Sequence, residues 1–106
     1  MTTPSVLDKL QALTNLYQKG YQSALVEQSL NKIIELEKDH LNREIQSLSL
    51  KIKGYEDKYQ LASQDFYLQF MAGELGDSMD FMEWSVFYEL LEVAQSRLET
   101  LQSIHS

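Results

Sequence analysis

The sequence LNREIQSLSLKIKGYEDKY, at residues 41–59, places an apolar side chain at every third or fourth position. The steps alternate between four and three residues, and Ile34 continues the series one heptad upstream of Leu41. The series consists of Leu41, Ile45, Leu48, Ile52, Tyr55 and Tyr59. This alternation is the a/d pattern of a coiled-coil seam. It predicts one long helix over residues 25–58, which passes through Gly54 because that residue lies away from the seam.

Shorter helices are expected on both sides of the long helix. Upstream, apolar residues recur at helical spacing from Val6 to Tyr17, and Gly20 stands where a C′ glycine ends a helix. Downstream, Ser63 is expected to cap a helix that ends near Gly73, and Asp77 or Ser78 is expected to cap the last helix. Four glycines and one proline are few for a chain with many β-turns. The sequence therefore predicts an all-α fold of three or four helices.

The 106 residues suit a single small domain, residues 1–106, and the charge divides it into two parts. Residues 1–60 form the helical-hairpin or coiled-coil part and are neutral overall. Residues 61–106 are rich in aromatic side chains and contain eight acidic residues but one basic residue, Arg97, so they carry the whole net charge of −7. Such a field repels nucleic-acid phosphates and attracts a basic protein partner; the alternative is that the charge serves only solubility. Nucleic acid is therefore not expected as a direct ligand.

The length of the predicted helix raises the question of what covers it. At about 1.5 Å per residue it extends for roughly 50 Å, whereas a compact chain of this size measures about 26–30 Å across. A helical hairpin within one chain would cover the seam, and so would a second copy of the chain. The upstream helix is too short to cover the rod, so the sequence favours a homodimer that pairs through residues 26–59.

The last predicted helix is apolar on most of its circumference. One stripe comprises Trp84, Phe87, Leu91, Ala94, Leu98 and Leu101. A second stripe comprises Met79, Met82, Val86, Leu90 and Val93. A helix this apolar is buried on most sides, and so small a chain has few helices with which to bury it. We therefore expect a second protein molecule to cover part of residues 79–94; the alternative is a self-contained core helix.

Signatures of catalysis and metal binding are weak. The absence of cysteine excludes disulfides, thiolate zinc sites and iron–sulfur clusters. The i, i+3 acids, such as Asp80 with Glu83 and Glu89 with Glu92, resemble magnesium ligands of helical nucleotide pyrophosphohydrolases, but here both pairs lie on one helix. Glu37-x-x-His40 supplies only half of a di-iron motif. We expect no catalytic residue, metal or cofactor, with a metal-dependent nucleotide hydrolase as the distant alternative.

Neither a signal peptide nor a membrane-spanning segment is evident in the sequence. Met1-Thr2-Thr3-Pro4-Ser5 lacks a basic n-region followed by an apolar h-region. No apolar run approaches the ~20 residues of a membrane span. We expect a cytoplasmic protein that does not contact membranes.

A protein–protein interface accounts best for the residues that remain. Aromatic anchors within a charged rim are typical of such interfaces, and both occur between residues 66 and 92. The predicted partner-binding residues are Phe66, Phe70, Asp77, Asp80, Phe81, Glu83, Trp84 and Tyr88. Phe81 and Trp84 are the expected anchors, and Asp77, Asp80 and Glu83 the expected rim. The alternative for the aromatic side chains is packing in the core of the chain itself.

Residues 59–84 also carry a resemblance to a known group of proteins. The segment has the pattern Y-x-x-x-S-x-x-F-Y-x-x-F from Tyr59 to Phe70, followed by AGELGD at residues 72–77 and DFMEW at residues 80–84. It resembles small helical bacterial antitoxin-like proteins of toxin–antitoxin operons. The resemblance covers about a quarter of the chain. It implies a protein that binds and neutralises a toxin encoded by an adjacent gene; the alternative is a coiled-coil adaptor or structural subunit.

Overall fold

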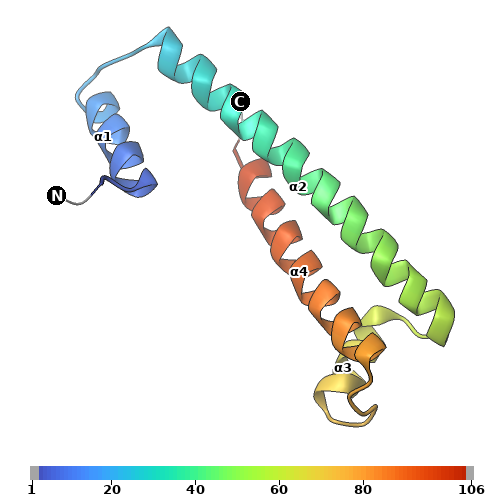
Figure 1. Ribbon diagram of the computed structural model, residues 1–106. Helices are drawn as coiled ribbons and strands as arrows, with labels where there is room; N and C mark the ends of the chain where they lie inside the picture. Colours follow the sequence, from blue (N-terminus) through green and yellow to red (C-terminus); the bar gives the residue numbers. More distant parts are fainter. Residues whose placement is uncertain (1–2, 105–106) are drawn as a thin grey trace. The chain divides into compact units, whose positions relative to one another are not determined.

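The computed structural model describes residues 3–104, which form four helices and no strand. The helices are α1 (Val6–Gln18), α2 (Ala24–Tyr59), α3 (Ser63–Met71) and α4 (Met79–Gln102) (Figure 1). The all-α class is confirmed, and so is the long helix, which continues through Gly54. Within the described residues, no helix has both the length and the apolar character needed to cross a membrane.

The chain divides into two compact units inside α2, between Ile33 and Ile34. The first unit contains α1 and the first turns of α2. The second contains the rest of α2 together with α3 and α4. The sequence suggested a division near residue 60, but in the structure Tyr55 and Tyr59 pack with residues that follow them in the chain.

The first unit is a short helical hairpin. Ser5 begins α1 with a capping box, in which its hydroxyl accepts from the Asp8 backbone N–H and the Asp8 carboxylate accepts from the Ser5 backbone N–H. After α1 the chain turns at Gly20, at the predicted C′ position. The Tyr17 hydroxyl bonds both the backbone N–H and the carbonyl of Ser23, 3.1 Å away in each case. These polar bonds, rather than a buried core, define the hairpin.

In the second unit α4 runs beside the second half of α2, and α3 lies where these two helices meet (Figure 1). The seam residues Leu41, Leu48 and Ile52 are buried, and Ile52 packs in one cluster with Trp84 of α4. Of the two explanations for the seam, a hairpin within one chain therefore accounts for the stretch from Leu41 to Tyr59.

Two tight helix ends fold the chain back at α3. Beyond α2 the Leu61 N–H reaches the Glu56 carbonyl, and beyond α3 the Glu74 N–H reaches the Gln69 carbonyl. Both are Schellman motifs with a left-handed C′ residue. The first has Gln60 there, at φ 51°, and the second has Gly73, at φ 77°.

The predicted cap of α3 differs in detail from the observed one. Ala62 holds the N-cap position and Ser63 is the first helical residue. The Ser63 backbone N–H donates to the Glu56 carboxylate over 2.9 Å, so a side chain from the end of α2 satisfies the start of α3. This leaves the Ser63 hydroxyl free to accept a bond from α4. At the start of α4, the cap is Ser78, one of the two predicted residues.

Candidate partner-binding site

A fully buried aromatic pair joins α3 to α4. The rings of Phe66 and Trp84 lie parallel, with centroids 3.7 Å apart, and neither residue has any exposed surface. The indole Nε1–H of Trp84 donates to the Ser63 hydroxyl over 2.9 Å. Ile52 of α2 completes the buried cluster. This cluster is the core of the second unit.

The structure corrects the predicted roles of Phe66 and Trp84. Both were expected to contact a partner, and Trp84 was expected to anchor it, but their side chains are enclosed by the chain itself. The physical reason is the turn after α2, which brings α3 across the face of α4 that bears Trp84. The stripe of α4 that begins at Trp84 is therefore the core stripe.

The three other predicted aromatic residues surround this core and are half-buried. Phe70 stacks on Phe66, with centroids 5.5 Å apart. Phe81 packs between Tyr59 and Phe66, at 5.0 and 5.6 Å. Tyr88 packs on Tyr67 of α3, at 4.9 Å. Their edges contribute to the surface, but most of their contacts are internal.

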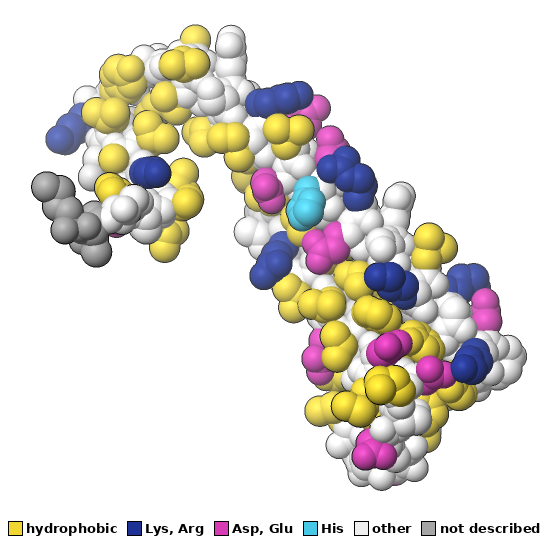
Figure 2. Space-filling view, viewed as in Figure 1, with side chains coloured by type: hydrophobic (Ala, Val, Ile, Leu, Met, Phe, Trp, Pro, Cys, Tyr) yellow, Lys and Arg dark blue, Asp and Glu magenta, His cyan; other side chains and the backbone are white. Residues whose placement is uncertain are grey.

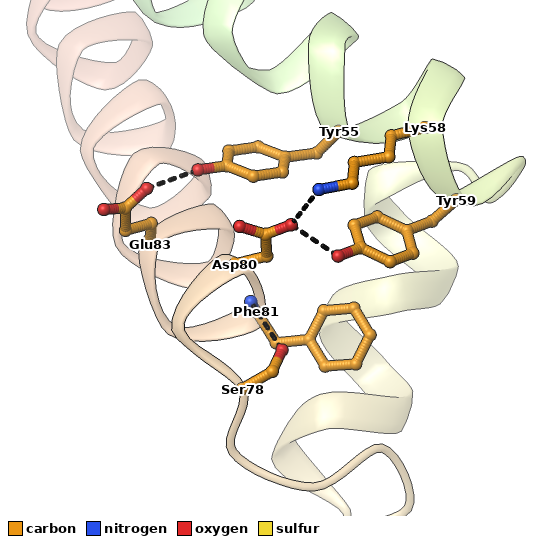
Figure 3. Close-up of polar contacts among 7 residues, drawn as sticks. All are labelled: Tyr55, Lys58, Tyr59, Ser78, Asp80, Phe81 and Glu83. Atoms are coloured by element: carbon orange, nitrogen blue, oxygen red, sulfur yellow. Dashed lines mark hydrogen bonds and ion pairs between the residues drawn. The ribbon is translucent and has the colours of Figure 1, made fainter.

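The predicted acidic residues differ in what they bind. Asp80 accepts from Lys58 over 2.7 Å and from the Tyr59 hydroxyl, and Glu83 accepts from the Tyr55 hydroxyl (Figure 3). Asp77 is exposed in the loop before α4. The structure thus brings Asp80 and Glu83 against the end of α2.

A third tyrosine–carboxylate bond fixes α4 to α3. The Tyr67 hydroxyl donates to Glu89 over 2.6 Å. The residues that sequence reasoning missed are thus the donors Tyr55, Lys58, Tyr59, Ser63 and Tyr67. A signal for them exists, because Tyr55 and Tyr59 lie one turn apart on α2 and Glu83 and Asp80 lie one turn apart on α4.

These bonds determine which carboxylates keep an uncompensated charge. Hydrogen bonding to Glu83, helped by burial and by the negative charge nearby, raises the pKa of Tyr55 to about 12. The bond to Glu89 likewise raises the pKa of Tyr67. Both tyrosines are therefore neutral at pH 7 and bring no positive charge to the carboxylates that they contact.

Asp80 behaves differently because its main partner is a cation. The bonds from Lys58 and Tyr59 lower the pKa of Asp80, and the bond to Asp80 raises the pKa of Lys58. The pair is thus ionised and mutually compensated at neutral pH. The acidic rim available to a partner is consequently Glu83 and Glu89, with Asp77 beyond the start of α4.

The first and last parts of the motif at residues 59–84 take part in this internal network. Tyr59 bonds Asp80, Ser63 bonds Trp84, and the ring of Phe66 stacks on that of Trp84. In this chain the spacing of the motif therefore encodes the packing of α3 and α4 on the end of α2.

The second apolar stripe of α4 is left exposed. Its members are exposed by 44–73%: Met79, Met82, Val86, Leu90 and Val93. Glu83 lies one turn from Met79, and Glu89 lies one turn from both Val86 and Val93, so acids border the stripe. Figure 2 shows hydrophobic and acidic side chains next to one another over the second unit. An apolar stripe with a negative border can hold a helix of complementary character.

The structure of residues 3–104 assembles no site for the metal-dependent chemistry considered from the sequence. Among residues 3–104, no three histidine, aspartate or glutamate side chains converge to hold a metal ion. His40 is exposed on α2, with Glu44 3.9 Å away. Comparisons with protein-family models, curated proteins and solved structures gave no match to the chain.

Proposed function

We propose that this protein is a protein-binding module and that its exposed α4 stripe receives an amphipathic helix of a basic partner. The observation that carries the proposal is the division of α4 into two apolar stripes, one buried in the chain and one exposed. Five large apolar side chains at helical spacing, exposed along nearly four turns, suit helix recognition. Met79 and Met82 add flexible, polarisable contacts, as is usual at such surfaces.

Electrostatics supports a basic partner over a neutral or acidic one. Helix α4 carries five acidic residues and one basic residue. Residues 34–106 carry 14 acidic and six basic residues, a net charge of −8. Such a surface speeds the approach of a cationic protein and slows that of an anionic one. Glu83 and Glu89 hold this charge at the border of the stripe, because their internal partners are neutral phenols.

The finer form of this proposal is that the partner is a toxin, which the protein neutralises by direct contact in the cytoplasm. This step rests on the resemblance of residues 59–84 to antitoxin-like proteins. An adaptor without inhibitory action would use the same stripe. The two forms differ in whether the partner stops growth when it is made alone.

Affinity capture with wild-type and variant baits tests whether the α4 stripe binds a basic protein. The wild-type chain and the Met82→Glu/Val86→Glu variant are used as baits in lysate of cells that make the protein, and bound proteins are identified by mass spectrometry. We expect a basic protein on the wild type and its loss from the variant. Leu50→Glu is the matched control, because Leu50 is an apolar residue exposed even more than Met82 and Val86 (73% against 51% and 50%) but lies on α2. Trp84, the sole tryptophan, reports by its emission that each bait is folded.

Four outcomes bear on the proposal. Equal capture by the wild type and the stripe variant would contradict it, as would loss of the partner from the Leu50→Glu control. If the captured protein arrests growth on its own and co-expression of the wild type, but not of the stripe variant, restores growth, the toxin form is supported. A captured partner without effect on growth would leave the adaptor form.

The rim is tested separately with Glu83→Gln/Glu89→Gln. Glutamine can still accept the tyrosine hydrogen bonds, so the fold is expected to persist while two charges are removed. Association with the captured partner should become slower and less dependent on salt, while dissociation changes little. An unchanged association rate would show that these charges do not guide the partner.

A further inference from the structure

The first unit has an apolar surface that nothing within it covers. No described residue up to Ile33 is buried. Six aliphatic side chains there are exposed by 44–77%: Val6, Leu7, Leu10, Leu16, Leu25 and Ile33. Figure 2 shows hydrophobic side chains gathered over α1 and the first turns of α2. This surface differs from the α4 stripe in both its position in the chain and its charge.

Between α1 and α2 this surface forms an open groove. The groove encloses about 430 Å³ and is lined mainly by apolar side chains, among them Leu10, Leu13, Tyr17, Val26 and Leu30. A helix of 13 residues such as α1 is marginal in water unless its apolar face is packed. Packing of a further apolar surface against this groove would therefore stabilise the helical hairpin.

We infer that this apolar surface packs against the same surface of a second copy of the chain, so that two α1–α2 hairpins form a four-helix bundle. Two helical hairpins that each expose one apolar face complete a common core when the faces meet. The pairing is isologous, because the same side chains serve both partners and the contact closes at two copies. The first turns of α2 take part, whereas the seam from Leu41 onward is already covered by α4.

The distribution of charge selects a second copy over the basic partner of the α4 stripe. Residues 1–33 hold three basic and two acidic side chains, a net charge of +1. A basic protein therefore gains nothing electrostatically at this unit. Two copies brought together here meet little repulsion, whereas two copies that met through residues 34–106 would each bring a net charge of −8.

The available area also fits a dimer. A buried aliphatic side chain removes roughly 60–120 Å² from water. The six exposed side chains, together with the groove-lining Leu13, Tyr17, Val26 and Leu30, thus represent several hundred Å². Each partner of a standard specific interface contributes about 800 Å². These side chains therefore supply a substantial part of the area that a stable homodimer buries.

Sedimentation of the full chain tests the inference without the unidentified partner. We expect the wild type to be a dimer at micromolar concentration and Leu10→Glu/Leu30→Glu to be a monomer. Each substitution should raise the dissociation constant of the dimer about 30-fold or more. Met82→Glu/Val86→Glu should remain dimeric, which separates this surface from the α4 stripe. A monomeric wild type, or dissociation caused by the α4 variant instead, would overturn the inference. Unchanged Trp84 emission in each variant shows that the second unit is intact.

Cross-linking covers the case in which the charged variant merely unfolds α1. Because the chain has no cysteine, a single introduced thiol can link only to another copy. Leu10→Cys should give a covalent dimer with a short bis-maleimide, and Leu50→Cys should give little. Equal cross-linking of both variants, or none of Leu10→Cys, would contradict the inference. Failure here leaves the α4 proposal untouched, because capture by that stripe is measured separately.

Discussion

Ser63 and Trp84 illustrate how single residues hold the second unit together. The Ser63 hydroxyl is the acceptor for a fully buried indole N–H, and the Ser63 backbone N–H bonds Glu56. A buried donor that loses its acceptor costs about 1–3 kcal/mol. The sequence identified Ser63 as a helix-start residue but not as the acceptor for Trp84, because the two are 21 positions apart and only the turn after α2 brings them together.

Removal of that acceptor should destabilise the protein measurably. Ser63→Ala is expected to lower the free energy of unfolding by about 1–3 kcal/mol, as measured by urea denaturation followed through Trp84 emission. Ser49→Ala is the control, because Ser49 is exposed on α2, and it should change the value by about 0.5 kcal/mol or less. Equal effects of the two substitutions would remove the energetic role of the Ser63–Trp84 bond.

Tyr55 makes the stability depend on pH in the alkaline range. Its folded-state pKa is about 12, against an ordinary value of 10, because its hydroxyl donates to Glu83. The folded state therefore retains a proton that the unfolded state loses. The stabilisation is complete below about pH 10 and is lost as the pH rises towards about 12. Tyr59, Tyr67 and Tyr88, whose pKa values are also raised, act in the same direction.

Denaturation midpoints measured at several pH values check this. The wild type should lose stability between about pH 10 and pH 12, and Tyr55→Phe should lose less over the same interval, because one titrating group is gone. Parallel curves for the two proteins would refute the assigned role of Tyr55. At the acidic end, the lowered pKa of Asp80 predicts a loss of stability as the pH falls through that pKa.

At the scale of elements, the turn after α2 determines where α3 lies. Gln60 occupies a left-handed position that favours glycine. For an L-residue this conformation costs roughly 1–2 kcal/mol, of which the greater freedom of unfolded glycine offsets about 0.5–1 kcal/mol. Gln60→Gly should therefore stabilise the protein by about 0.5–1 kcal/mol, and Gly73→Ala, at the equivalent position after α3, should destabilise it. A destabilised Gln60→Gly would show that the Gln60 side chain, which bonds the Asp57 carbonyl, outweighs the strain.

Sequence patterns predicted the elements more completely than their pairing. The heptad series from Leu41 to Tyr59 predicted α2. The apolar spacing from Val6 to Tyr17 predicted α1, and the cap candidates Asp77 and Ser78 predicted the start of α4. The same series did not tell whether α4 or a second copy covers it, because both supply the same apolar face. In the structure of the single chain, Leu41, Leu48 and Ile52 are buried without a second copy.

The candidate site shows the same division between what is local and what is not. The two stripes of α4 follow from helical spacing alone, and both were evident in the sequence. Which stripe is buried depends on where α3 packs. The aromatic side chains led us to expect Trp84 at the partner interface, whereas it lies in the core. The methionine stripe is less conspicuous, yet it is the one left at the surface.

At the scale of the whole molecule, the two units combine different surfaces with different charge. Residues 1–33 are weakly basic and expose an apolar groove, whereas residues 34–106 are strongly acidic and expose the α4 stripe. We propose that the first surface joins two copies and that the second binds the partner. Each copy in such a dimer would present its own stripe, so one dimer would bind two partner molecules.

Methionine oxidation tests the central claim, that the exposed α4 stripe is the partner-binding surface, most directly. Exposed methionines oxidise readily, and covered ones are protected. In the isolated protein Met71, Met79 and Met82 are all exposed, by 63%, 73% and 51%. In the complex with the captured partner, mass spectrometry should find Met82 and Met79 protected, while Met71, at the end of α3, continues to react. Oxidation of Met82 at the same rate with and without the partner would contradict the claim.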